Sequence, residues 1–190
     1  MSSNLHIEYP DLTALISLIK NELKREINCV SVGTINSFDS TNQTANVTIN
    51  YKKVLKKKSA IGTKEYNDVI IEYPMLLKCP VLVLNGGGAH ITFPIRSGDD
   101  CVVLFCDRDI DLWLEKGYKN NPPGSERMHD LSDAIAIVGI NSLKDSIGSY
   151  DADKLKIKYG NGYITIDDSG SINVQGSSII INGTTVNINP

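Results

Sequence analysis

The stretch VSVGTINSFDSTNQTANVTINY, residues 30–51, decides the fold, because the hydrophobic pattern takes a period of two there. Apolar and polar residues alternate over 30–38 and again over 44–51, and the polar segment DSTNQ separates the two runs. Such alternation is typical of half-buried strands, and a short polar turn between two such runs is typical of an antiparallel hairpin. We therefore expect a β-domain to begin here.

Further strands are expected after this hairpin. HDLSDAIAIVGIN predicts one of them, and the other candidate segments are residues 69–73, 81–84, 89–94 and 101–106. DIDLWLEKG, closed by Gly117, predicts a single short helix with Trp113 and Leu114 in the core. Five or six strands with one short helix favour a small closed barrel over a large sandwich, so we expect a mainly β chain with an OB-fold over 29–140.

Residues 1–28, before the hairpin, predict an amphipathic helix. Asp11 is suited to an N-cap, and apolar residues then recur at spacings of three and four: Leu12, Leu15, Ile16, Ile19, Leu23 and Ile27. This apolar stripe could pack on the chain's own domain or dock on another subunit. Both interpretations stay open on the sequence.

The C-terminal part has a different repeat. Residues 141–154 have the Ser, Asp and Gly content of a linker. Over 155–190, short apolar pairs recur every seven or eight residues with glycines between them: Ile164/Ile166, Ile172/Val174, Ile179/Ile181 and Val186/Ile188. A single-chain β-helix needs on the order of 18 residues per coil, so this repeat is too short to complete one alone.

Three chains could complete the coil together. We expect an intertwined homotrimeric β-helix or β-prism spike whose shared core is formed by those eight Ile and Val residues. The alternative is a plain β-meander added to the barrel, or an amyloid-like segment restrained by its glycines.

The composition sets limits on partners and compartment. The 190 residues include 19 basic and 22 acidic ones, and a net charge of -3 is too small to indicate a nucleic acid or a membrane surface as partner. The start lacks a signal-peptide pattern and no apolar run is long enough to span a membrane, so we expect a soluble product made in a cytoplasm. The four cysteines lack metal-site spacing, and we expect reduced, buried thiols.

A lysine-rich segment offers the main alternative function. Five lysines occur over 52–58, and we expect a solvated hairpin extension. With Tyr51 or Tyr66, the same lysines could instead make the barrel a module that binds single-stranded nucleic acid.

Three motifs resemble known sites without completing them. HDLSD, residues 129–133, lacks a nucleophile elbow. Asp107, Asp109 and Asp111 open like a calcium loop, but Leu112 and Tyr118 stand where that loop needs glycine and a carboxylate. The segment NGGGAH lacks the remainder of a phosphate-binding loop and predicts a turn with positive φ.

The remaining candidates for chemistry are also weak. The three histidines, His6, His90 and His129, are scattered, so no metal site is predicted. Arg108 stands between carboxylates, and we expect it to form ion pairs that fix the barrel to its short helix. We therefore expect neither an enzyme nor a cofactor.

GGGAHITFPIRSGDDCVVLFCDRDIDLWLEKG, residues 86–117, and RMHDLSDAIAIVGI, residues 127–140, resemble the central spike proteins of contractile-tailed phages and related tail-like particles. The resemblance extends over about residues 30–140 and includes VGTINSFDSTNQTANV. It implies a trimer whose OB-fold attaches to the baseplate hub and whose β-helix is driven through the host's outer envelope by sheath contraction.

The resemblance also implies a role for individual residues. The glycine turn, Gly86, Gly87 and Gly88, matches the family motif. Other matching positions look architectural in such proteins and would hold the barrel and its trimer contacts: Asp107, Arg108, Asp109, Asp111, Trp113, His129, Asp130, Ser132 and Asp133.

The sequence at the tip departs from the family pattern, and this departure affects which partners are expected. Some such spikes end in histidines that hold an iron ion, but no histidine follows His129 here. The chain would end in a metal-free tip or be capped by a separate small tip protein, and no nucleic acid is expected as partner. Its place would be the tail baseplate of a virion or tail-like particle. A fused envelope-degrading enzyme is not expected, because the segment between Asn141 and Leu155 is too short to hold one.

Overall fold

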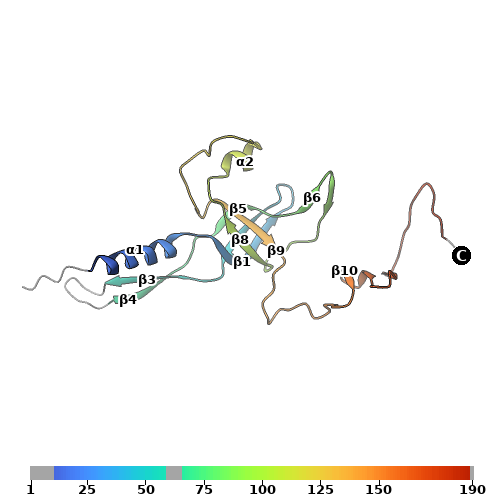
Figure 1. The fold of residues 1–190 in the computed structure, drawn as a ribbon. Coiled ribbons are helices and arrows are strands. Elements are labelled where there is room, and N and C mark those ends of the chain that lie inside the picture. Colours follow the sequence, from blue (N-terminus) through green and yellow to red (C-terminus); the bar gives the residue numbers. More distant parts are fainter. Residues whose placement is uncertain (1–10, 59–65, 189–190) are drawn as a thin grey trace, which may run out of the picture. The chain divides into compact units, whose positions relative to one another are not determined.

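The chain forms two compact units in the computed structural model, which describes residues 11–58 and 66–188. The first unit is Met1–Ile140 and the second is Asn141–Pro190. Each unit has a β-sheet of its own (Figure 1). The described part of the chain is mainly β, as the sequence predicts, with one longer and one shorter helix.

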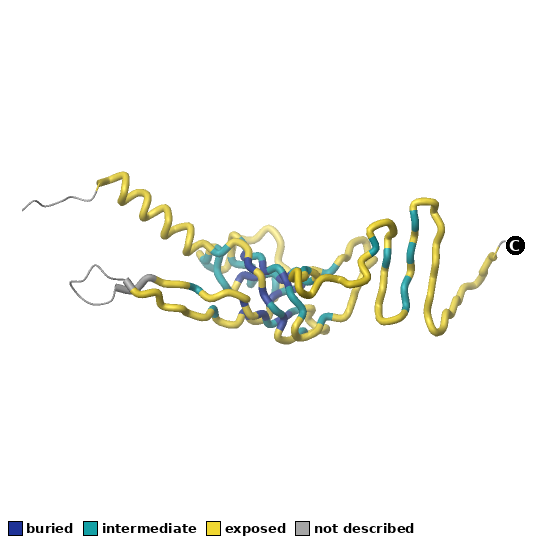
Figure 2. The backbone as a smooth tube through the Cα atoms, turned by 90° about the horizontal axis from the view of Figure 1, so that it is seen from below, coloured by how far each residue is buried: buried dark blue, intermediate teal, exposed yellow. Residues whose placement is uncertain are grey.

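Helix α1, Leu12–Glu26, begins where the sequence predicts. The Asp11 carboxylate accepts a hydrogen bond from the backbone N–H of Thr13 at 3.1 Å and caps the helix. Lys24 and Arg25 lie in the last turn, where positive charge complements the helix dipole. The helix buries none of its residues and is exposed along its entire length (Figure 2).

Five antiparallel strands form the main sheet of the first unit. Their order is β5-β2-β1-β8-β9, and their bounds are β1 Val30–Asp39, β2 Thr44–Ile49, β5 Leu76–Pro80, β8 Asp100–Phe105 and β9 Ala134–Val138. The hairpin predicted at residues 30–51 is therefore confirmed as β1 and β2. A shift of register between Ile35 and Ser37 places an irregularity in β1 that bends the sheet.

The main sheet curls into a half-barrel. Val81, directly after the edge strand β5, forms an isolated parallel bridge with Ala136 on the opposite edge strand β9. The N–H of Leu82 donates to the carbonyl of Ala136 at 2.9 Å. Among the described residues the two edges are joined only by this bridge, so the structure shows a curled half-barrel where the sequence predicts a closed OB-fold barrel.

Two hairpins and a short helix complete the first unit. Strands β3, Lys53–Lys58, and β4, Tyr66–Ile71, form the expected lysine-rich hairpin. Strands β6, Leu84–Gly86, and β7, Ala89–Ile91, are joined by Gly87 and Gly88 at φ +59° and +84°. Two successive positive φ values suit a tight hairpin turn, as expected for the three glycines. Helix α2, Asp111–Lys116, ends at Gly117 with φ +65°.

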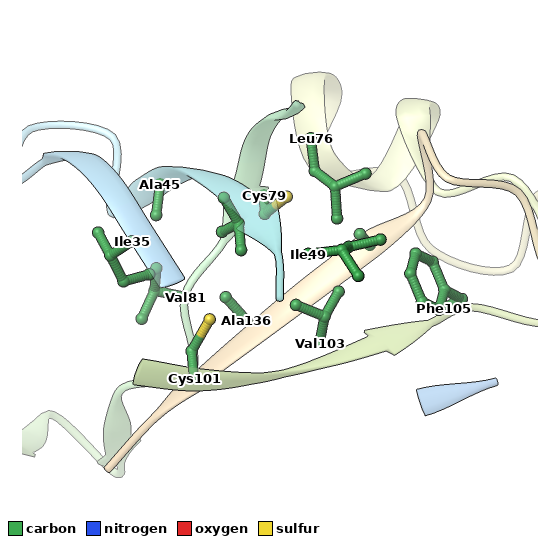
Figure 3. Close-up of a cluster of buried hydrophobic side chains, with 12 residues drawn as sticks. Ile35, Ala45, Ile49, Leu76, Cys79, Val81, Cys101, Val103, Phe105 and Ala136 are labelled. Atoms are coloured by element: carbon green, nitrogen blue, oxygen red, sulfur yellow. The ribbon is translucent and has the colours of Figure 1, made fainter. Parts of the chain in front are cut away.

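Alternate residues of the half-barrel point inward and form its core (Figure 3). The buried apolar residues are Ile35, Ala45, Val47, Ile49, Leu76, Cys79, Val81, Cys101, Val103, Phe105, Ala134 and Ala136. Burial raises the pKa of the Cys79 and Cys101 thiols to about 11, so both stay protonated near neutral pH. All four cysteines are free, but the prediction of four buried thiols is wrong for exposed Cys29 and half-buried Cys106.

The second unit is a three-stranded antiparallel meander. Strands β10, Leu155–Tyr159, β11, Gly162–Ile166, and β12, Ile172–Gln175, pair in chain order. No β-helix is present in residues 141–188 of the single chain, and residues 176–188 contain no strand. Over 155–175, one chain therefore has the local structure that the sequence offered as the alternative, a meander.

Several other local predictions are wrong. Residues 76–80 form strand β5 where a separator between strands was expected, and 81–84 contribute only an isolated bridge and the first residue of β6. Trp113 is 49% exposed and Leu114 is only half-buried, so neither belongs to the core.

Candidate functional site

An arginine and three aspartates form a polar cluster in the first unit. Arg127 comes from the loop after α2, and its guanidinium contacts three carboxylates. Nη2 lies 3.0 Å from Asp109 Oδ1, 2.8 Å from Asp111 Oδ2 and 3.0 Å from Asp133 Oδ1, and Nε donates to Asp133 Oδ2 at 3.1 Å. The pairing with Asp133 is therefore bidentate, the geometry that planar guanidinium groups favour.

Backbone N–H groups and the Ser125 hydroxyl donate further hydrogen bonds to two of these carboxylates. Fully buried Asp133 also accepts from the N–H of Ile110 at 3.0 Å. Asp109 accepts from the Ser125 hydroxyl at 2.6 Å and from the N–H of Asp111 at 2.8 Å. The hydrogen bonds that Asp109 accepts, the one from the Ser125 hydroxyl first, hold the pKa of Asp109 below its usual value. The hydrogen bonds that Arg127 donates to Asp133 and to Asp111 hold the pKa of Arg127 above its own usual value.

The arrangement of this cluster suits a structural role better than a catalytic or metal-binding one. Its members come from the start of α2, the following loop and the start of β9, so the contacts tie these three segments together. The three carboxylates offer oxygens within 4.8 Å of one another, but the Arg127 guanidinium already lies among them and neutralises part of their charge. We conclude that Arg127 takes the place that a cation would need.

Arg127 corrects one prediction made from the sequence. Exposed Arg108 was expected to form the ion pairs that fix the barrel to the short helix, but it forms none with any residue in the described ranges. Arg127, 19 positions further along the chain, forms them. No local pattern identifies Arg127, because it lies in a loop without periodicity and its partners lie on both sides of it in the sequence, Asp109 and Asp111 before it and Asp133 after it.

The other predicted motif residues adjoin the cluster. His129 has φ +50°, its Nε2 lies 3.0 Å from Asp107 Oδ1, and its buried Nδ1 has no partner among the described residues. Its carbonyl accepts from the Asn28 side chain at 3.0 Å. Asp130 accepts from the N–H of Ser132 at 2.8 Å, which lowers the pKa of Asp130. The segment 129–133 thus forms a turn, and no serine, histidine and carboxylate are aligned there for nucleophilic attack.

A hollow lies beside the glycine hairpin. It has a volume of about 970 Å³ and is lined by residues of β6, β7 and the end of β1, among them Phe38, Gly87 and Phe93. His90 is the one titratable side chain in its lining. A general acid, a base and a nucleophile are thus not brought together by the lining of this hollow.

The residues considered for nucleic-acid binding are partly engaged elsewhere. The Tyr51 hydroxyl lies 2.6 Å from the Ser31 hydroxyl, and its ring meets Tyr73 edge to face at 5.5 Å. Lys52 pairs with Glu72 at 2.8 Å. The side chains of Lys56, Lys57, Lys58 and Tyr66 lie outside the described residues.

The eight residues predicted for the spike core are all exposed in the single chain. Their exposed fractions run from 38% for Ile166 to 82% for Ile188. In the meander, register places Leu155, Ile166 and Ile172 in one row across the strands. Ile157, Ile164 and Val174 form the next row on the same face.

The opposite face of the meander is polar. Lys156, Thr165 and Asn173 form one row there, and Lys158, Tyr163 and Gln175 form the other. The sheet therefore has one apolar face and one polar face, but nothing in its own unit covers the apolar face, because no described residue of 141–188 is buried. A sheet of this kind needs a partner surface.

Comparisons with known proteins identify one family. Residues 32–139 match the family described as "Phage protein Gp138 N-terminal domain", so the match covers more than half of the chain. No curated protein matches the chain. Neither helix in the described part is both long and apolar enough to cross a membrane.

Proposed function

Because the chain belongs to the family of the phage protein Gp138 N-terminal domain, a baseplate and spike type of family, we propose that it is the central spike of a contractile tail. In this proposal three copies form the spike and the half-barrel attaches it to the baseplate hub. The C-terminal unit is driven through the host's outer envelope when the sheath contracts. The protein is then a structural component of the virion.

The exposed apolar face of the meander carries this proposal. Six apolar residues in two rows cannot remain in water at the surface of a stable monomer without favouring association. Three copies that turn these faces toward a common axis would bury them, and residues 176–188 would continue the same core with Ile179, Ile181, Val186 and Ile188. The predicted intertwined β-prism would then form between chains.

A trimeric spike of this kind would resist bending. Its backbone hydrogen bonds would be satisfied around the axis, and its apolar core would have no free sheet edge. The work of piercing would come from the sheath, and this chain would transmit force without catalysing a reaction. A separate small tip protein is a further partner in this proposal.

Solution molar mass tests the proposal directly. We expect light scattering to give three times 20.8 kDa for the full chain, and a smaller mass or weaker association for a chain that ends at Tyr150. The shortened chain should also fail to restore infectivity or killing to particles that lack the spike. A full chain that is monomeric at all concentrations would contradict the proposal, as would full activity of the shortened one.

A further inference from the structure

The outer face of the half-barrel carries a second unpartnered apolar surface. Register places Val30, Leu104 and Ile135 in one row across β1, β8 and β9. The next row is Val32, Val102 and Ile137. We call these six residues the outer patch.

The outer patch faces away from the core. Its neighbours along β1, Ser31 and Gly33, are buried on the inner face, whereas Val30 and Val32 are 59% and 46% exposed. The outer face of a curled sheet is normally polar when it meets water. The other four residues of the patch are half-buried. Two exposed and four half-buried aliphatic residues in adjacent rows therefore indicate a surface that another element covers.

Helix α1 has the apolar stripe that such a patch needs. Four apolar residues lie on one side of the helix, and each residue is more than 40% exposed: Leu12, Ile16, Ile19 and Leu23. At about 1.5 Å per residue, the stripe from Leu12 to Leu23 is about 16 Å long, which is enough to cross the three strands of the outer patch at their spacing of about 5 Å. The stripe can therefore cover the outer patch, and both surfaces are aliphatic.

One flank of the helix is complementary in charge to one end of the outer patch. Lys20 and Lys24 lie along one side of the stripe and form no ion pair with a residue in the described ranges. Asp99 and Asp100 lie at the end of the outer patch where β8 begins. A basic flank on the helix and an acidic rim on the sheet would set the orientation of docking.

The chain's own helix is poorly placed to cover its own patch. Only residues 27–29 separate α1 from β1, and hydrogen bonds hold them at three points, two through the backbone and one through the Asn28 side chain. The N–H of Ile27 donates to Leu23 at 3.1 Å, the Asn28 side chain donates to the carbonyl of His129, and the N–H of Phe105 donates to the carbonyl of Cys29 at 3.0 Å. Ile27 is extended, so the chain runs from the helix into the strand without the reversal that folding back would require.

We propose that α1 of one copy docks its apolar stripe on the outer patch of a neighbouring copy. Each copy would give a helix to the next and receive one from the previous, a head-to-tail contact that closes into a ring of three. This inference rests on the proposed trimer. It assigns the N-terminal helix to contacts between copies and leaves the hub to bind elsewhere on the half-barrel.

Cross-linking of the full-length chain tests the contact. In a Cys29→Ser and Cys106→Ser background, Ile19→Cys and Val32→Cys are introduced together, and a short thiol-to-thiol cross-linker is added. We expect covalent dimers and trimers, and we expect none from either substitution alone. Asn21→Cys with Val32→Cys is the matched control and should not cross-link, because Asn21 lies on the opposite side of α1.

Each other outcome overturns the inference in a recognisable way. Covalent dimers from Ile19→Cys alone would mean that the helices pair with each other, and covalent dimers from Val32→Cys alone would mean that the patches do. A link within one chain would mean that α1 folds back. A trimer by light scattering without cross-linking of the double variant would refute the contact and leave the spike proposal standing, whereas a monomer would refute both.

Discussion

Arg127 is the residue on which the region around α2 depends. Its guanidinium pairs with fully buried Asp133, so Arg127→Met would leave a buried carboxylate without its partner. Breaking a buried pair from one side costs about 3 to 5 kcal/mol, and we expect the lower end because Arg127 itself is 31% exposed. Urea unfolding of the two proteins measures the difference.

Arg108 provides the matched control for this prediction. Arg108→Met removes an exposed arginine from the same region without removing an ion pair to any described residue, so its stability should stay close to that of the parent. Equal losses in the two variants would show that the ion-pair cluster has no special role.

The pH dependence of stability is a further check on the cluster. Because the pKa of Asp109 is lowered in the folded state, its contribution to the free energy of unfolding is present above about pH 4 and is lost as pH falls further.

These two arginines also show what the sequence could not reveal at this scale. The aspartates were recognisable because DRDIDL and HDLSD attract attention as motifs. The arginine that joins them lies in the loop between them, and its place depends on how β8 and β9 align. Only the tertiary structure chooses Arg127 over Arg108, because both lie within a few positions of a carboxylate.

The contact between β1 and its neighbours depends on Gly33. A Cβ atom there would lie 2.7 Å from Val47 Cγ1, 3.0 Å from the Thr48 carbonyl oxygen and 3.1 Å from Val103 Cγ2. Gly33→Ala should therefore overpack the centre of the sheet and destabilise the half-barrel by about 1 to 3 kcal/mol. The shift of the urea midpoint measures this cost.

Gly86 offers the corresponding control in the β6 strand. A Cβ atom on Gly86 would meet nothing within 4 Å, so Gly86→Ala should leave the urea midpoint almost unchanged. If Gly33→Ala were equally neutral, strands β1, β2 and β8 would have to be further apart than the structure places them.

Elements with a strict period were predictable, and the irregular one was not. Helix α1 and the hairpin of β1 and β2 have clear patterns, and both are present. Strand β5 was missed because its buried residues, Leu76 and Cys79, are three positions apart. Lys78 between them has φ +54°, and this kink breaks the alternation that identifies a strand.

The two units differ in whether one chain can complete them. In the described parts of the chain, all twelve buried apolar residues belong to the first unit, so the half-barrel has a core of its own, whereas the second unit has a sheet with one uncovered apolar face. The repeat of the tail correctly predicted strands at Ile164/Ile166 and Ile172/Val174 and an apolar face there, but Ile179/Ile181 and Val186/Ile188 lie in no strand. It could not reveal the meander, because the same pattern serves strands that pair within a chain or between chains.

Separating the units tests this difference. A chain ending at Ile140 should keep its strand signal in circular dichroism and unfold cooperatively in urea, because its core is intact. A fragment of residues 141–190 should show little strand signal when dilute and gain it as concentration rises, since its apolar face is buried only by association. In that fragment, Ile164→Asn should abolish the gain, whereas Thr165→Asn on the polar face should preserve it. Full strand content at the lowest concentration, or equal effects of the two substitutions, would mean that the meander is stable in one chain and that its apolar face does not drive assembly.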